Sequence, residues 1–279
     1  MGKKNMPIKE KNFPVGLFLS PKIIPVVASY YNAARLIDDI ADNANLSCDE
    51  KLVQLDQIEK DFFAQTSDTV AGELSQIFSK HNLSSGLFTD LLEAFRRDAK
   101  NQQIEIWEQL LDYCRYSAAP VGRFLLALHN ENPATYLPAE ILCTILQIVD
   151  HIQDLKFDVC ELRRCYIPSE LMCKYNVEKT DICLTYATPQ LRLLIDEMVS
   201  RLEHMVKDAK ILLRLIKNTR LKTEVAVIFS LTNSMLKKIK KGDIIATSPK
   251  LTKTDWAKAV FYGLGVGLFL RTKSCNIIR

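Results

Sequence analysis

The sequence contains little glycine, 9 residues among 279. That is under half of the usual share of about 7%. Because the tight turns of β proteins depend on glycine, this scarcity argues against a turn-rich β fold. Hydrophobic residues make up 48% of the chain, which is enough for a substantial core. We therefore expect an all-α protein, and the lack of repeats and linkers favours one domain over residues 1–279.

Long apolar runs are also missing. No run reaches the 18 or so residues that a membrane-spanning helix needs. The closest run begins at Ala259, contains three glycines and is followed by Arg271 and Lys273. We expect a terminal apolar helix over residues 259–271, and we leave open whether it belongs to the core or rests on a membrane surface. Residues 1–12 are basic and polar, and we expect them to be loose.

Three kinds of binding signature are absent as well. The 8 cysteines form no CxxC pair or Cys/His cluster with zinc spacing. No GxGxxG fingerprint is present, so we expect no NAD(P)H. The net charge is only +4, and the densest basic run, residues 237–241, fits a solvated helix end better than a nucleic-acid site. With no signal peptide ahead of the cysteines, we expect a cytoplasmic, reduced protein in which Cys114, Cys143 and Cys160 behave as small buried hydrophobes.

Apolar residues recur with the 3.6-residue period of a helix along most of the chain. The predicted helices span residues 21–43, 49–65, 70–79, 85–99, 105–130, 137–158, 188–217, 223–240 and 254–271, with a short one starting at Ser169. Ser47 and Glu50 have the spacing of a capping box for the second helix. Pro120 lies inside the fifth helix, where it should produce a kink because it cannot donate to the carbonyl of Tyr116.

The most informative stretch is the end of the helix predicted at 137–158. Asp150, Asp154 and Asp158 are spaced four residues apart, so one continuous helix would align them in a row. Like charges in such a row repel, at about 0.2 to 0.5 kcal/mol per pair. Because the preceding residues 141–149 are almost entirely apolar, the row should lie near a buried interior. We therefore expect a bound cation there.

A second acidic cluster ends the first predicted helix. Asp38 and Asp42 share one face of that helix, and Asp39 lies about 100° away. Taken alone, the cluster fits a solvated face, although carboxylates at a helix C-terminus oppose the helix dipole. Two acidic helix ends that face each other can instead hold Mg²⁺ together with the phosphate oxygens of a substrate. The two clusters together thus predict a magnesium and diphosphate site.

Four motifs resemble those of the squalene and phytoene synthase family. Asp-Asp-x-x-Asp at 38–42, preceded by Tyr31 and Arg35, resembles the first aspartate-rich motif. Residues 113–123 resemble the central helix, Gln153, Asp154 and Asp158 the second acidic motif, and residues 164–168 its Arg-x-Tyr-Leu-Pro continuation. The resemblance covers residues 11–270. Ser-Ala-x-Pro-Val-Gly-Arg at 117–123 and Asn-Phe-Pro at 12–14 are most similar to the bacterial hydroxysqualene synthase branch.

The resemblance implies a single-domain class I isoprenoid synthase fold, a helical bundle around a central cavity with the acidic motifs at its mouth. It implies several Mg²⁺ ions, held by Asp38, Asp39, Asp42, Asp150, Asp154 and Asp158. It implies substrate-binding residues, namely Tyr31, Arg35, Gln147, Gln153, Arg164 and Tyr166. The implied catalytic residues are Tyr113, Asp38, Asp42 and Asp154. Tyr113 could instead be a core tyrosine with a satisfied hydroxyl, and we expect His151 to serve packing rather than ligation.

Two positions depart from the family pattern. Asp150 stands where the family commonly has Asn, which keeps an oxygen ligand but adds a negative charge. Ala119 stands where the hydroxysqualene branch usually has Asn before Pro120, which removes a polar contact at the kink. We expect the first change to preserve metal binding and the second to weaken the assignment to that branch.

The implied activity is Mg²⁺-dependent conversion of presqualene diphosphate to hydroxysqualene, for squalene and hopanoid synthesis. The diphosphate would leave, the cation would rearrange and water would capture it, without a nicotinamide donor. The alternative within the family is head-to-head condensation of two prenyl diphosphates to presqualene diphosphate, squalene or phytoene. Two other classes stay open at this point, a non-catalytic assembly factor and a helical adaptor with solvated acidic surfaces. Lipid substrates also suggest peripheral contact with the inner face of the membrane.

Overall fold

The computed structural model describes residues 16–269, and within that range it is helical and contains no strand. Its elements are α1 (Ile24–Ala41), α2 (Cys48–Ala64), α3 (Val70–Lys80), α4 (Gly86–Ala99), α5 (Trp107–Ser117), α6 (Ala119–Leu128), η1 (Pro133–Thr135), α7 (Tyr136–Gln153), α8 (Leu155–Cys160), α9 (Ser169–Tyr175), α10 (Lys179–Ile182), α11 (Pro189–Ala209), α12 (Leu212–Leu215), α13 (Thr219–Lys241) and α14 (Lys253–Phe269). The predicted all-α class is confirmed. The segment predicted to be loose, 1–12, and the last residues of the predicted helix 259–271 lie outside the described range.

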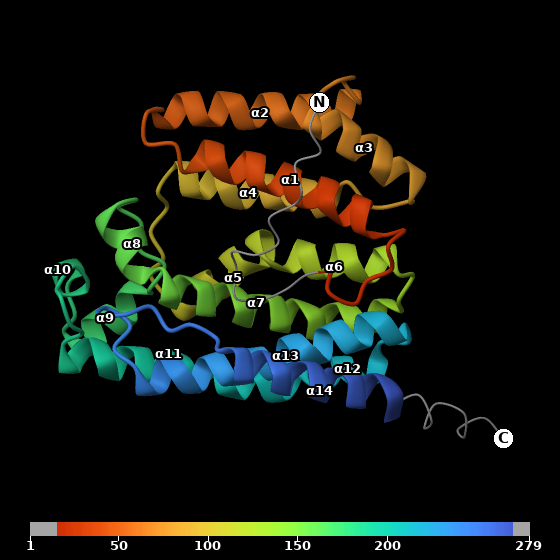
Figure 1. The fold of residues 1–279 in the computed structure, drawn as a ribbon. Helices are drawn as coiled ribbons and strands as arrows, with labels where there is room; N and C mark the ends of the chain where they lie inside the picture. Colours follow the sequence, from red (N-terminus) through yellow and green to blue (C-terminus); the bar gives the residue numbers. More distant parts are fainter. Residues whose placement is uncertain (1–15, 270–279) are drawn as a thin grey trace.

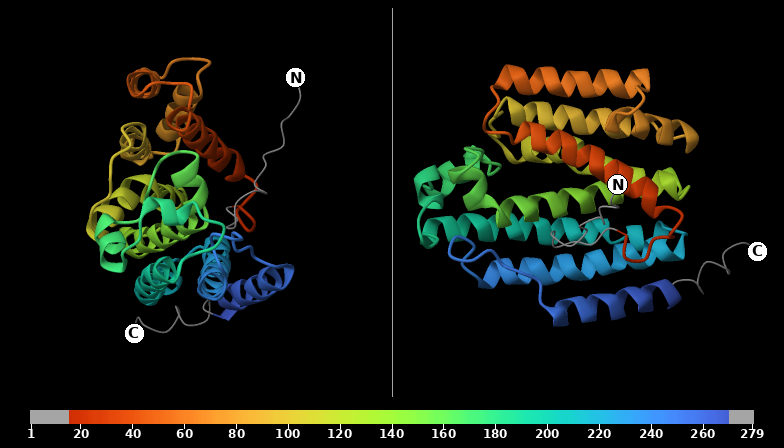
Figure 2. Two further views of the ribbon diagram at one scale, coloured as in Figure 1. Left: turned by 90° about the vertical axis from the view of Figure 1, so that its left-hand side faces the viewer. Right: turned by 45° about the horizontal axis from the view of Figure 1, so that its top comes forward.

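The long helices lie in layers, with α2 and α3 on one side and α14 on the other (Figures 1 and 2). Between them, α1 and α4 form one layer, α5, α6 and α7 the next, and α11 and α13 a third (Figure 1). Large side chains such as Phe88, Phe124, Ile145 and Ile148 are fully buried between these layers. Tyr30 stacks on Phe124 with ring centroids 4.1 Å apart, which joins α1 to α6. A main hydrophobic core therefore connects most of the layers, and a small second cluster of Val227, Leu231 and Ala259 lies between α13 and α14.

Side chains cap the starts of several helices, and the cap of α2 was predicted. Ser47 accepts a hydrogen bond from the Glu50 backbone N–H, and the Glu50 side chain accepts one from the Ser47 N–H, which confirms the capping box of α2. At the starts of α11 and α13, the side chains of Thr188 and Asn218 accept a hydrogen bond from the backbone N–H three residues later. Such caps satisfy backbone donors that a helix start leaves unpaired.

Three predicted helices are in fact divided. Residues 105–130 form α5 and α6, which separate at Ala118, because Pro120 begins a new helix instead of only bending the old one. Residues 188–217 form α11 and α12. The helix predicted at 137–158 ends at Gln153 and resumes as α8, and Asp154 lies between the two parts with φ −94° and ψ 3°. The prediction of one continuous acidic row was therefore wrong.

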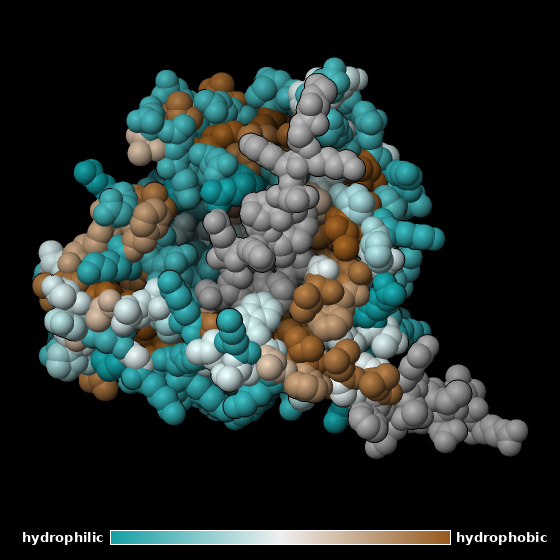
Figure 3. All heavy atoms as spheres, viewed as in Figure 1, coloured by the Kyte–Doolittle hydropathy of each residue, from teal (hydrophilic) through white to brown (hydrophobic). Residues whose placement is uncertain are grey.

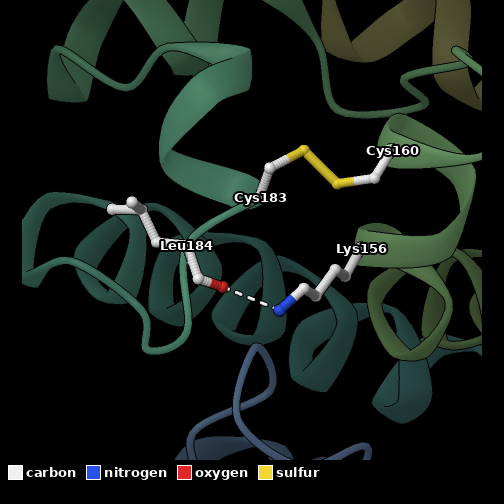
Figure 4. Close-up of a disulfide and its surroundings, with 4 residues drawn as sticks. All are labelled: Lys156, Cys160, Cys183 and Leu184. Carbon is white, nitrogen blue, oxygen red and sulfur yellow. Dashed lines mark hydrogen bonds between the residues drawn. A yellow bond between two sulfur atoms is a disulfide. The ribbon is translucent and has the colours of Figure 1, made fainter.

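A disulfide joins Cys160 at the end of α8 to Cys183 just after α10 (Figure 4). The Lys156 ammonium also donates to the Leu184 carbonyl, at 2.7 Å, so two contacts hold α8 to the α10 segment. The expectation that all cysteines are reduced was wrong for this pair, because sequence spacing did not show that α8 and α10 pack together. Cys114 is buried as predicted, and Cys143 is half-buried.

Candidate active site

The two acidic motifs lie at the same end of the bundle. Both α1 and α7 run toward the left-hand side of Figure 1, where α1 passes into the loop before α2 and α7 passes into α8. The space-filling view shows a hollow with hydrophilic surface on this side of the molecule, between the layer of α1 and that of α7 (Figure 3). The fold thus brings together segments that are more than a hundred residues apart in the sequence.

Arg164, which follows the second motif in the sequence, binds the end of the first motif. One terminal nitrogen of its guanidinium donates to the Asp42 carboxylate and the other donates to the Ala41 carbonyl at the end of α1. Arg164 is 8% exposed, so its charge lies in a poorly solvated place where charge-assisted hydrogen bonds are strong. It also satisfies a carbonyl that the end of α1 leaves unpaired. The structure thus places Arg164 beside Asp42.

Arg35 neutralises the rest of the first motif. Its guanidinium lies 3.1 Å from an Asp38 oxygen and 3.0 Å from an Asp39 oxygen, and all three side chains lie on α1. These groups are partly or largely exposed, so each ion pair contributes little to stability by itself. Tyr31 lies exposed one turn before Arg35. Helix α1 and its C-cap therefore carry carboxylates, a guanidinium group and one tyrosine.

The second motif is arranged less regularly than its spacing suggests. Asp154 is exposed and Asp150 is half-buried, whereas Asp158 is buried with its carboxylate 3.9 Å from the His151 ring. The backbone still makes i to i+4 hydrogen bonds from Asp154 to Asp150 and from Asp158 to Asp154, both 2.9 Å long. The break in the helix at Asp154 thus leaves the three aspartates with different exposure, although the backbone hydrogen bonds between them are kept.

The two predicted glutamines are engaged with protein groups. The Gln153 amide donates to the Pro249 carbonyl at 2.8 Å, which ties the end of α7 to the loop before α14. The Gln147 amide lies 3.2 Å from a ring nitrogen of His151. His151 in turn stacks on Tyr166, with ring centroids 3.8 Å apart. This stacking agrees with the expectation that His151 serves packing.

A buried hydrogen-bond network lies behind these residues. Tyr113 donates to one Asp98 oxygen at 2.8 Å, and Tyr166 donates to the other at 2.9 Å. Burial raises the pKa of Asp98, although Arg164 and the two tyrosine hydroxyls act against that rise. Burial, followed by the Asp98 charge, holds the pKa of Tyr113 and of Tyr166 well above the usual value. Both hydroxyls therefore stay protonated and act as donors.

Sequence reasoning missed Asp98, because no motif marks this position in the helix predicted at 85–99. A signal was available in the pattern of buried positions. Leu91, Ala94 and Asp98 follow the helical period, and all three are buried in α4. A carboxylate on the apolar stripe of a helix must find donors inside the protein. Asp98 finds them in the two tyrosines that the resemblance assigned to the site.

The donor chemistry of the six aspartates suits Mg²⁺, which prefers carboxylate oxygens. Within residues 16–269, however, no group of three or more Asp, Glu, His or Cys side chains is arranged to hold a metal ion. Asp38, Asp39 and Asp42 point their oxygens at Arg35 and Arg164 instead. Rotation of these exposed or half-exposed side chains is therefore required before the carboxylates can gather around an ion.

The sequence model of the family named squalene/phytoene synthase matches residues 9–256. A hydroxysqualene synthase from Zymomonas mobilis is 34% identical over 94% of this chain and 89% of its own length. Another from Sinorhizobium fredii is 33% identical over 84% of this chain and 81% of its own.

Solved structures agree with this result. The crystal structure of squalene synthase HpnC from Alicyclobacillus acidocaldarius covers 81% of this chain and 86% of its own, with a TM-score of 0.72 and 29% identity. A dehydrosqualene synthase has a TM-score of 0.77 at 24% identity, covers 89% of this chain and 88% of its own, and shares the fold. The fold is thus that of the class I isoprenoid synthases. The chain belongs to the squalene/phytoene synthase family and is a prenyl diphosphate-using enzyme.

Proposed function

We propose that this enzyme is a Mg²⁺-dependent hydroxysqualene synthase that converts presqualene diphosphate to hydroxysqualene. The observation that supports this most directly is the guanidinium of Arg164, which joins the end of the first acidic motif to the segment that follows the second. The resemblance to hydroxysqualene synthases over most of the chain supports the choice of reaction.

The aspartates of both motifs would hold the metal and, through it, the diphosphate. In this proposal Asp38, Asp42, Asp150 and Asp154 are ligands, and Asp39 and Asp158 assist. Bound Mg²⁺ would neutralise the charge that develops on the leaving diphosphate. Arg35 and Arg164 would exchange a carboxylate for a phosphate oxygen, since a guanidinium binds either one with the same fork geometry. Tyr31 and Gln147 would bind at the edges of the diphosphate.

The reaction begins with heterolysis of the C–O bond, whose electron pair leaves with the diphosphate. The carbocation rearranges, and a water oxygen then forms the new C–O bond and loses a proton. Because the Tyr113 hydroxyl is engaged with Asp98, this residue would stabilise the cation through the face of its ring. Tyr166 and Gln153, which also donate to protein acceptors, would hold the Arg164 and Asp154 segments in place. No step consumes a reductant, so no NAD(P)H is needed.

Product analysis tests this assignment. Incubation with presqualene diphosphate and Mg²⁺, without a reductant, should release hydroxysqualene. Turnover of farnesyl or geranylgeranyl diphosphate alone would instead support head-to-head condensation to presqualene diphosphate, squalene or phytoene. A presqualene diphosphate synthase from Zymomonas mobilis that is 28% identical over 66% of this chain makes that comparison necessary.

Two variants of the second motif separate metal binding from general charge effects. Asp154→Asn removes a proposed ligand and should lower turnover by about a hundredfold or more. Asp150→Asn restores the residue common in the family and keeps an oxygen ligand, so its turnover should stay within a few-fold of the parent. Equal losses in the two variants would contradict the assigned ligand set.

We also propose that the enzyme works in the cytoplasm, at the inner face of the membrane. The proposed substrate and product have long hydrocarbon tails, which partition into lipid. No helix within residues 16–269 is both long and apolar enough to cross a bilayer. We propose that a surface of the enzyme makes this contact, and nucleic acid is not an expected partner.

A further inference from the structure

Helix α14 packs against α13 through residues with small side chains. Ala259 is completely buried, and Gly263 and Gly267 follow it at intervals of four residues. A side chain at Gly263 would lie 2.5 Å from the Val227 side chain, and one at Gly267 would lie 2.2 Å from the Thr223 hydroxyl. Only glycine permits an approach this close. One face of α14 is thus fixed to the protein.

The other face of α14 is apolar and exposed. Phe261 is 77% exposed, Leu268 66%, Leu264 42% and Tyr262 40%. The sequence from Ala259 to Phe269 contains no charged residue. In Figures 1 and 2, α14 lies at the outer edge of the bundle, and Figure 3 shows hydrophobic surface in the same region. A continuous exposed apolar row on a terminal helix indicates an interaction surface.

Basic residues flank both ends of this row. Lys253 and Lys258 are exposed in the first half of α14. At the opposite end, Thr219 of α13 lies against Gly267, and the neighbouring Lys217 and Arg220 are exposed. The acid in α14, Asp255, is bound to Thr252 and Lys238. The row therefore has exposed lysines at its start, and exposed basic residues of α13 lie near the helix end that contains Gly267.

We infer that α14 is the surface by which the enzyme binds a bilayer that contains anionic lipids. Helices that lie in the membrane interface combine these two features, because apolar side chains enter the acyl boundary while lysine and arginine contact acidic headgroups. This inference rests on the proposed function, since a lipid substrate gives the enzyme reason to be at a bilayer. Beyond the proposed membrane contact, it specifies which surface of the enzyme binds and which lipid charge that surface prefers.

A second copy of the chain fits this surface less well than a bilayer. A symmetric dimer through α14 would place the same residues of both copies together, so their flanking lysines and arginines would repel. One row of four side chains is also small for a stable interface, which usually buries about 1,200 to 2,000 Å² in total. The charge pattern therefore favours an anionic bilayer.

Vesicle flotation with the full chain tests the inference. The parent protein should float with vesicles that mix phosphatidylcholine and phosphatidylglycerol, and much less with pure phosphatidylcholine. The double variant Phe261→Ser, Leu268→Ser should float about tenfold less. The matched control Val53→Ser, Leu193→Ser changes two residues with 67% and 56% exposure on other helices, and it should float like the parent.

The charge contribution is tested separately. Lys253→Glu, Lys258→Glu should reduce flotation with the anionic vesicles and leave the weak binding to phosphatidylcholine unchanged. Failure of the parent to float, or equal losses in the control and the Phe261 variant, would overturn the inference. A dimer in light scattering that only the Phe261 variant disrupts, without any flotation, would also overturn it in favour of self-association.

Activity distinguishes this inference from the proposed reaction. With presqualene diphosphate dispersed in detergent, the Phe261→Ser, Leu268→Ser protein should turn over at the parental rate, because neither residue belongs to the site. Flotation of a parent protein that does not turn over this substrate would contradict the proposed reaction while supporting the membrane surface. Turnover by a parent protein that does not float would support the proposed reaction and contradict the membrane surface.

Discussion

At the scale of single residues, Asp98 is a buried carboxyl group that two tyrosine hydroxyls bind at a cost in stability. Its carboxylate is 7% exposed and accepts hydrogen bonds from the Tyr113 and Tyr166 hydroxyls. A buried carboxylate loses hydration that two neutral donors replace only in part. The raised pKa of Asp98 reflects that loss. Its benefit must then lie in the fixed positions of the two tyrosine rings.

The variant Asp98→Asn should be more stable and less active than the parent. An acid whose pKa is raised by folding contributes its full stability below the pKa of the unfolded chain, about 3.9, and loses it as the pH rises toward the folded value. At pH 7 the parent therefore lacks the stability that this carboxyl group contributes at low pH, whereas the amide does not titrate and avoids that loss. We expect a higher melting temperature at pH 7, a smaller difference near pH 4, and turnover lower by about a hundredfold because the rings shift.

The control for this variant is Asp112→Asn. Asp112 pairs with Arg97 at 2.8 Å, and its side chain is 48% exposed, so its loss should change the melting temperature and the turnover little. A parental turnover in the Asp98→Asn protein would show that the tyrosines need no buried acceptor. A melting temperature that falls equally at both pH values would contradict the raised pKa.

Individual site residues were predictable only where they occur in motifs. Asp42 and Arg164 were each singled out because each belongs to a recognisable string of residues, and the structure places them side by side. Asp98 has no such string, and its function depends on Tyr113 from α5 and Tyr166 from a loop. The exposure of Asp154 could not be predicted either, since no proline or glycine marks the break between α7 and α8. Side-chain environment depends on packing between elements that one sequence does not specify.

At the scale of elements, the contact of α13 with α14 depends on particular glycines. A Cβ at Gly263 would meet Val227 and, at 2.9 Å, the Thr223 carbonyl oxygen of α13. A Cβ at Gly265 would meet nothing within 4 Å. Gly263→Ala should lower the free energy of unfolding by about 1 to 3 kcal/mol through overpacking. Gly265→Ala should raise it by up to about 1 kcal/mol, since alanine is the better helix former.

Denaturant unfolding of the two alanine variants measures this difference directly. The same substitution two positions away on the same helix controls for helix propensity. Equal stability of the two proteins would mean that α14 can move away from α13 without cost. In that case the glycines would not fix the orientation of the exposed apolar face.

The disulfide stabilises a second pair of elements, α8 and the segment after α10. Cys160 and Cys183 are 23 residues apart, and a cross-link over such a loop should contribute about 3 kcal/mol to the free energy of unfolding. We expect Cys160→Ser to lose about that amount in unfolding experiments without reductant. Cys173→Ser, which removes an exposed free thiol on α9, should lose almost nothing.

Addition of a dithiol reductant extends this prediction. It should lower the stability of the parent to that of the Cys160→Ser protein and leave the variant unchanged. A parent that is insensitive to reductant would show that the bond is absent or contributes nothing. Because α8 also bears Asp158, substrate affinity should weaken together with stability when the bond is broken.

At the scale of the whole molecule, the periodicity of the sequence was sufficient for the fold class and the motifs for the family. Apolar residues at helical spacing determine which face of each helix is buried, and the layers follow from covering those faces. The convergence of α1 and α7 at one end was expected from their acidic clusters and from the resemblance. The apolar pattern of residues 24–41 alone does not specify which helix packs against α1. Neither the periodicity nor the motifs predicted how the carboxylate side chains are oriented.

The electrostatics of that end of the molecule predict how the enzyme responds to ligands. Three aspartates lie at the C-terminal end of α1, where they oppose the helix dipole, and two guanidinium groups offset them only partly. Mg²⁺ together with pyrophosphate should bind there, whereas pyrophosphate alone would add negative charge. At a hundred times its dissociation constant, a ligand of the folded state adds about 2.7 kcal/mol of stability. That corresponds to a rise in melting temperature of about 5 °C.

Thermal unfolding with each component alone and with both tests this account. We expect a large rise only with both, because Mg²⁺ supplies the charge that lets carboxylates and phosphate oxygens share one site. The double variant Asp38→Asn, Asp154→Asn removes one proposed ligand from each motif, so its rise should fall below about 1 °C. If the full rise persisted in that protein, the ligand would be binding to basic residues elsewhere, and the two acidic helix ends would be separate charged surfaces instead of one site.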